Sequence, residues 1–191
     1  MIVENSPKTD NHLWRRFRRS RSGSAAVEFA FVMPIFFAIV FSMMEAGWLM
    51  SKIALTENAV LSISRDIYTG AADPNSSNHQ ATINQQSLKE KICAGVPLIG
   101  DCTNNISLEI IGINTLQDIP TNAAVCRDSF SSAVQPTATY NPAGTSEISV
   151  IRVCLTTDIL FPGLGLGLHL PKNAQGRYQI VSLLAFVNEP F

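Results

Sequence analysis

The feature that most constrains the fold is an apolar block near the N-terminus, at residues 24–50. Its centre, residues 29–44, holds no charged residue, and the nearest charges are Glu28 and Glu45. As a helix, the segment between these two carboxylates would be about 26 Å long, slightly less than a hydrocarbon core of about 30 Å. The block therefore predicts a membrane-spanning helix at about residues 27–49, with Trp48 near the interface.

The charges on either side orient this block. Residues 1–23 contain six of the 14 basic residues and two of the 15 acidic ones, so the remainder has eight basic against 13 acidic residues, a net charge of −5. Five of the basic residues directly precede the block: Arg15, Arg16, Arg18, Arg19 and Arg21. By the positive-inside rule they predict a cytoplasmic N-terminus. An acidic body with its arginines confined to one tail argues against a nucleic-acid-binding protein.

Two other interpretations of the block compete with a membrane span. A cleavable secretory signal has a shorter apolar run and a small-x-small cleavage site. Here Met44 and Ala46 would occupy the two small positions, and Met is too large. A buried core helix does not require five arginines directly before it. A membrane-spanning helix fits both the length and the flanks best.

Two residues of the block, Pro34 and Glu28, are unusual in an apolar helix. Pro34 predicts a kink near Ala30, which membrane helices tolerate better than soluble ones. Glu28 begins the apolar run, where an ionised and unpaired carboxylate is costly and indicates a functional partner. In the simpler interpretation, Glu28 lies in the first helical turn at headgroup level, favoured by the helix dipole.

Residues 21–37, RSGSAAVEFAFVMPIFF, resemble the N-terminus of the TadE-like proteins, minor pseudopilins of the tight-adherence (Flp-type) pilus system. The shared motif covers residues 15–47: a basic leader, a glycine, four small or apolar residues, Glu-Phe, and an apolar helix with a proline. A weaker similarity lies in a late strand and the C-terminal residues 188–191, NEPF. The middle of the chain matches only in general character.

The resemblance implies that a prepilin peptidase in the inner membrane cuts after Gly23 and leaves Ser24 as the new N-terminus. The new α-amino group, with a pKa of about 8, would be mostly cationic. In a filament it would pair with Glu28 of another subunit, replacing two lone buried charges by one pair. Phe29 stands where major Flp pilins carry tyrosine, which favours the pseudopilin group. The implied partners are the peptidase, other pseudopilins and the major pilin.

The helical pattern continues beyond the apolar block as an amphipathic extension. Apolar residues recur there at mostly three- to four-residue steps: Leu49, Ile53, Val60, Ile63 and Ile67. Gly70 is a good terminator, so we expect one helix from Ser24 to Tyr68. The predicted organisation is a cytoplasmic leader at 1–23, a spine helix at 24–69, and a periplasmic α+β head at 70–191.

The head is predicted to be a small, pilin-like α+β unit. Turn-forming residues at 71–78 precede a short helix at 80–93. Strands are expected at 106–113 and 147–156, with a continuous apolar strand at 178–187 suited to a core position, giving an antiparallel sheet of about three strands. Residues 115–145 are expected to be mostly loop. Residues 161–170, FPGLGLGLHL, lack phosphate-binding spacing and predict a flexible apolar connection that contacts the membrane surface or a partner.

All four cysteines, Cys93, Cys102, Cys126 and Cys154, lie in the predicted periplasmic part. Two disulfides are therefore expected, and four cysteines permit three connectivities. We favour Cys93 with Cys102, which closes a short loop, and Cys126 with Cys154, which ties the long loop to a strand. A metal site is not expected, because there is no CxxC pair and the histidines are scattered.

No nucleophile or metalloprotease motif is present, so the sequence predicts no enzymatic activity, cofactor or small-molecule substrate. The favoured hypothesis is a minor pseudopilin, a single-pass protein of the bacterial inner membrane that is an assembly component of a tight-adherence pilus. Gly23 and Ser24 would form its processing junction, and Glu28 with Phe29 its assembly site. The alternatives are a permanently anchored periplasmic binding module and an enzyme released by signal peptidase.

Overall fold

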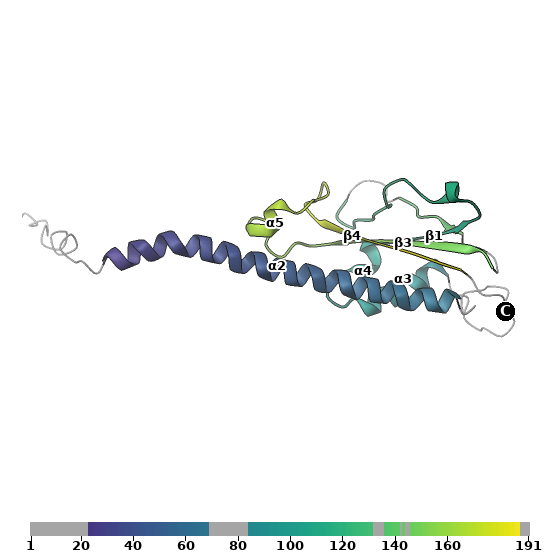
Figure 1. Ribbon diagram of the computed structural model, residues 1–191, viewed down its shortest axis with the longest axis horizontal. Helices are drawn as coiled ribbons and strands as arrows, with labels where there is room; N and C mark the ends of the chain where they lie inside the picture. Colours follow the sequence, from purple (N-terminus) through teal and green to yellow (C-terminus); the bar gives the residue numbers. More distant parts are fainter. Residues whose placement is uncertain (1–22, 69–83, 132–135, 142, 144–145, 188–191) are drawn as a thin grey trace, which may run out of the picture. The chain divides into compact units, whose positions relative to one another are not determined.

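The computed structural model describes residues 23–68, 84–131, 136–141, 143 and 146–187 (Figure 1). A long apolar helix precedes a small head of short helices and a four-stranded sheet, which confirms the predicted α+β class. The chain divides after Val40 into two units, residues 1–40 and 41–191. The predicted leader up to residue 22 and the C-terminal motif at 188–191 lie outside the described residues.

Helix α2 runs from Gly23 to Tyr68 and contains Pro34. In its second half Val60, Ile63 and Ile67 are almost fully buried. Their spacing places them on one helix face, so the amphipathic pattern in the sequence marks the face that packs in the head. Arg65 in the last turn interacts favourably with the negative end of the helix dipole.

Three long strands form the antiparallel part of the sheet: β1 (Ile106–Ile113), β3 (Ile148–Thr157) and β4 (Tyr178–Val187). A fourth, β2 (Tyr140–Asn141), pairs in parallel with β1, and the order is β2-β1-β3-β4. The sheet is therefore mixed and four-stranded, where the sequence predicted about three antiparallel strands. Two residues are too few to show an alternating pattern, so β2 had no detectable signal.

Strand β4 was predicted to take a core position, and this was wrong because it lies at the edge of the sheet. Ile180 is buried, whereas Val181, Leu183 and Val187 are each at least half exposed. A continuous apolar run shows that both faces of a strand are apolar. Its place in the sheet depends on which strands pair with it, and the run itself does not contain that information.

The short helix expected at 80–93 is α3 (Gln85–Gly95), and residues 80–83 lie outside the described part of the chain. Asn84 and Ser87 form a reciprocal capping box that starts it, with Ser87 N donating to Asn84 Oδ1 at 2.8 Å. Helix α4 (Cys102–Asn105) and the 3-10 turn η1 (Leu116–Asp118) had no separate prediction.

The glycine-rich stretch at 161–170 was expected to be a flexible connection, and the structure corrects this. It holds a short helix, α5 (Gly165–His169). Gly167 is buried so closely against residues 159–161 that a Cβ there would clash with the carbonyl of Phe161. Gly167 therefore permits close packing of two backbone segments, a role separate from the conformational freedom of glycine.

We define the head as the second unit, residues 41–191, which includes the second half of α2. It has three layers (Figure 1). The second half of α2 packs with α3 on one face of the sheet, where alternate residues of β1 and β3 join them in one hydrophobic core: Ile106, Leu108, Ile110, Ile151, Val153 and Leu155. The segment between β1 and β2 covers the opposite face. That outer layer contacts polar side chains, including Arg152 and Thr156 of β3.

Candidate functional site

The predicted processing and assembly residues lie together in the first turns of α2. Ser24 Oγ donates a hydrogen bond to Glu28 Oε1 at 3.2 Å, one helical turn away. Phe29 is 59% exposed, and a Cβ placed on Gly23 would meet nothing within 4 Å. The first described turns of α2 thus carry one carboxylate, and the residues before Gly23 lie outside the described part of the chain.

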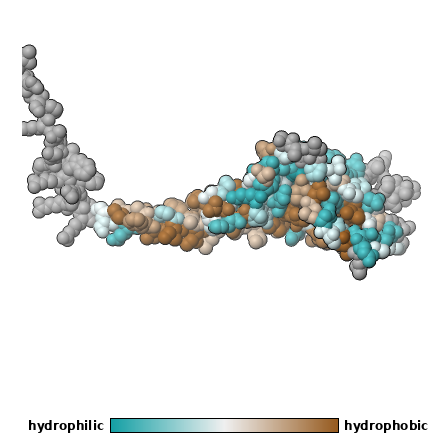
Figure 2. Space-filling model, turned by 90° about the horizontal axis from the view of Figure 1, so that it is seen from above, coloured by the Kyte–Doolittle hydropathy of each residue, from teal (hydrophilic) through white to brown (hydrophobic). Residues whose placement is uncertain are grey.

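The apolar part of α2 exposes most of its large side chains. Phe31, Val32 and Ile35 are 76%, 63% and 67% exposed, and α2 is long and apolar enough to cross a membrane. Figure 2 shows hydrophobic side chains along the visible face of this part of α2, whereas hydrophilic side chains are frequent on the head. Such a surface is unfavourable in water and favourable in lipid, so it fits a membrane-anchored protein.

A second cluster of polar contacts lies where the head begins on α2. Glu45 is 2% exposed and accepts hydrogen bonds from the backbone N–H groups of Leu160, at 3.1 Å, and Phe161, at 2.7 Å. Ser42 Oγ accepts one from Leu166 N at 3.1 Å. From the sequence, Glu45 was only the charge that ends the uncharged centre of the apolar block, and this role was not predicted. The local sequence around Glu45 could not show this role, because the residues that bond to Glu45 are 115 and 116 positions away.

Lys52 extends this cluster along the same face of α2. It is buried, and its Nζ donates to Thr157 Oγ1 at 2.7 Å and to the carbonyl of Asp158 at 3.0 Å. Burial lowers the pKa of Lys52, and the nearby carboxylates of Asp158 and Glu45 partly oppose this. Lys52 is not one of the apolar positions that define the packed face of the amphipathic extension, so the sequence pattern did not predict its burial.

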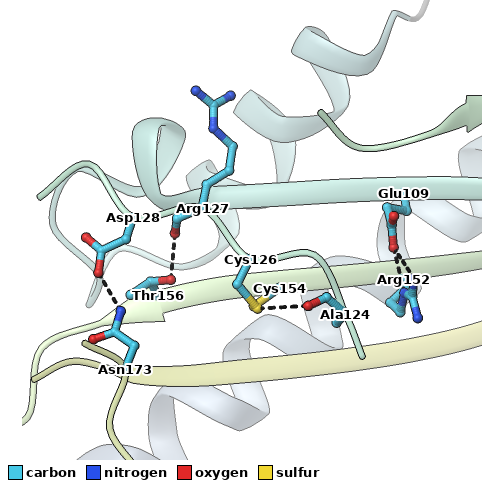
Figure 3. The surroundings of a disulfide bond; sticks show 9 residues. All are labelled: Glu109, Ala124, Cys126, Arg127, Asp128, Arg152, Cys154, Thr156 and Asn173. Carbon is cyan, nitrogen blue, oxygen red and sulfur yellow. Dashed lines mark hydrogen bonds and ion pairs between the residues drawn. A yellow bond between two sulfur atoms is a disulfide. The ribbon is translucent and has the colours of Figure 1, made fainter. Parts of the chain in front are cut away.

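The structure pairs Cys93 with Cys102 and Cys126 with Cys154, the two pairs that the sequence analysis favoured among three connectivities. The first links α3 to the start of α4, with Cα atoms 5.6 Å apart. The second links the outer layer to β3 (Figure 3), with Cα atoms 5.1 Å apart. Both bonds therefore join segments that the short helices and the sheet alone would hold weakly.

Ion pairs supplement the second disulfide on the outer face of the sheet (Figure 3). Arg152 of β3 pairs with Glu109, which is opposite it on β1, at 2.6 Å, and it also donates to the carbonyl of Asn122 at 2.7 Å. Thr156 Oγ1 donates to the carbonyl of Arg127 at 2.6 Å. These buried groups satisfy each other and attach the outer layer to β3, so they have a structural explanation.

Asp128 is the centre of a further buried network. Its carboxylate accepts from Asn173 Nδ2 at 2.6 Å and Arg177 Nη1 at 2.9 Å, and also from the backbone N–H of Phe130. Burial alone would raise the pKa of Asp128, but these hydrogen bonds outweigh it and hold the pKa below its usual value. Arg177 also pairs with Asp158, so this network connects three loops of the head.

Among the described residues, no group of three or more His, Cys, Asp or Glu side chains could hold a metal ion. The polar clusters described above are satisfied by protein groups, and the residues with exposed functional chemistry are those at the start of α2. Residues 23–65 match the family model of TadE-like proteins.

This segment is TadE-like. The match confirms the resemblance seen in the N-terminal motif. The TadE-like match covers almost all of α2 and ends before the head. No curated protein and no solved structure matches the chain.

Proposed function

We propose that this chain is a minor pseudopilin, an assembly component of a tight-adherence pilus. It is held in the inner membrane by α2, with its N-terminus in the cytoplasm and its head in the periplasm. The observation that carries the proposal is the carboxylate of Glu28, five positions after Gly23 in an exposed apolar helix, inside the TadE-like match. In lipid such a group favours a cationic partner.

Processing creates that partner. A prepilin peptidase hydrolyses the peptide bond between Gly23 and Ser24, and the new α-amino group of Ser24 is mostly protonated at neutral pH. The hydrogen bond from Ser24 Oγ uses one position on the Glu28 carboxylate, which has about four acceptor sites. The carboxylate can therefore also accept the amine of a neighbouring subunit, which removes two lone charges from the lipid together.

The test replaces Glu28 by alanine and by glutamine. We expect both variants to be cleaved after Gly23 and to reduce pilus formation strongly, measured by mass spectrometry of the mature N-terminus and immunoblots of sheared pili. Glu57→Gln is the matched control, because Glu57 is an exposed carboxylate on the same helix. Intact cleavage together with intact pili in Glu28→Ala would refute the assembly role.

The mature N-terminus also separates the proposal from the two alternatives. A start at Ser24 supports the pseudopilin. An intact Met1 favours a permanently anchored periplasmic binding module, and a start well after Glu45 favours an enzyme released by signal peptidase. The prepilin peptidase, other pseudopilins and the major pilin are the partners to test by crosslinking in the same strains.

A further inference from the structure

The segment at residues 159–170 presents apolar side chains at the point where the head begins on α2. Leu160, Leu164 and Leu168 are 45%, 49% and 58% exposed. Leu164 is the N-cap residue of α5, and Leu168 lies within that short helix. Met43 and Met44 of α2 are also more than half exposed near this point. We call the three exposed leucines the leucine edge.

Several backbone N–H groups of residues 160–170 are already bonded within the protein. Glu45 accepts from the N–H groups of Leu160 and Phe161, and Ser42 accepts from Leu166 N. Leu164 N donates to the carbonyl of Phe161, at 3.3 Å, and Leu170 N to that of Leu166, at 3.2 Å. Entry of a segment into a low-dielectric phase costs less when its backbone polar groups are paired, and these five bonds reduce that cost.

The position of the leucine edge is also fixed. The ring of Phe161 contacts Phe41 of α2, with centroids 4.7 Å apart. Gly167 is packed against the carbonyl of Phe161 so closely that no side chain fits there. A buried carboxylate is costly, so the use of Glu45 to hold this loop indicates that its placement matters. The contacts hold this loop against Phe41, which lies within the apolar run of α2.

We propose that the leucine edge inserts into the outer part of the lipid bilayer from which α2 emerges. Phe41, Ser42 and Glu45, which hold this loop, belong to the predicted membrane span at about residues 27–49, so lipid is the nearest apolar phase. Lys172, which is exposed and bonded to the carbonyl of Pro162, lies close enough to contact anionic headgroups. The inference rests on the proposed membrane insertion of α2 and is independent of cleavage after Gly23.

The test measures lipid contact at single positions of the full-length chain. Leu164→Cys and Leu168→Cys are spin-labelled without reductant, so that both disulfides stay closed, and are reconstituted in vesicles of phosphatidylethanolamine and phosphatidylglycerol. Collision rates with oxygen, which partitions into lipid, are compared with those of a water-soluble nickel chelate. Leu61→Cys is the matched control, because Leu61 is 46% exposed on α2 but far along the helix from Ser42.

We expect the ratio of oxygen to nickel collisions to be severalfold higher at positions 164 and 168 than at 61. A ratio equal to that at 61 overturns the inference, since it places the leucines in water. Protection from both reagents also overturns it, since a protein partner would then cover them. Phe31→Cys reports separately on α2: a lipid signal at 31 with a water signal at 164 refutes the leucine edge alone, whereas a water signal at 31 refutes membrane insertion as well.

Discussion

The apolar part of α2 and the head use charge in opposite ways. Up to Val40, the described part of α2 has one charged side chain, Glu28, which is exposed among exposed apolar residues. The head instead buries several charged groups and bonds them to each other or to the backbone: Glu45, Lys52, Glu109, Asp128, Arg152 and Arg177.

This difference separates two kinds of stability. The head has a hydrophobic core, two disulfides and satisfied buried charges, so its fold depends on contacts within the chain. The apolar part of α2 presents its side chains outward and requires lipid or other helices around it. Mutations in the head should therefore lower its free energy of unfolding, whereas mutations in the apolar part of α2 should leave it nearly unchanged. Both can be measured by unfolding the full-length chain in detergent.

The largest expected effect compares two apolar side chains of the same helix. Ile63 is fully buried and Phe31 is 76% exposed. Ile63→Ala should lower the free energy of unfolding of the head by about 2–5 kcal/mol, because it removes core contacts and leaves a cavity. Phe31→Ala should change it by less than about 0.5 kcal/mol. Equal losses in denaturant unfolding would contradict the division.

Next come the disulfides of the head. Replacing Cys126 and Cys154 together by alanine should cost about 2–4 kcal/mol, because the bond closes a loop with a sequence separation of 28. The same change at Cys93 and Cys102, separated by 9, should cost about 1 kcal/mol less in the chain-entropy account. Calorimetric unfolding of both double variants tests the order, and a larger loss for the short loop would refute the entropic explanation.

A smaller loss of stability is expected at Glu45, close to the point in the sequence where the apolar part of α2 ends and the head begins. Glu45→Gln removes the charge, retains one acceptor oxygen and leaves one of the two bonded backbone N–H groups without an acceptor. We expect a loss of about 1–3 kcal/mol in the free energy of unfolding of the head. Glu57→Gln, on the exposed face, should cost under about 0.5 kcal/mol and is the control. A similar result for both would show that Glu45 does not hold the 160–161 loop.

The smallest effect is a pH dependence. Because the folded pKa of Asp128 lies below its ordinary value of 3.8, its ionised form stabilises the head above that pH, and this stabilisation is lost as the pH falls through the folded pKa. Asp128→Asn should be less stable at neutral pH and should lose less on acidification. Unfolding midpoints at about pH 5 and pH 3 measure this, and parallel losses in both proteins would contradict it.

Several elements could be predicted because their signals are local. The three- to four-residue spacing of Val60, Ile63 and Ile67 identified the packed face of α2, and β-branched residues identified β1 and β3. The edge position of β4 and the two-residue strand β2 could not be predicted, because strand order depends on pairings between distant segments. The burial of Glu45 and Lys52 was missed for the same reason, since their partners lie more than 100 positions away.

The sequence by itself determined the apolar helix, its flanking charges and the TadE-like start of α2, because composition, order and short spacing carry that information. Only the tertiary structure decided which charged residues are buried, which strand lies at the edge, and that the loop after β3 is held against Phe41 and Ser42 of α2. Those features arise from contacts across the whole head, where a carboxylate on α2 finds its backbone partners in a loop near the other end of the chain.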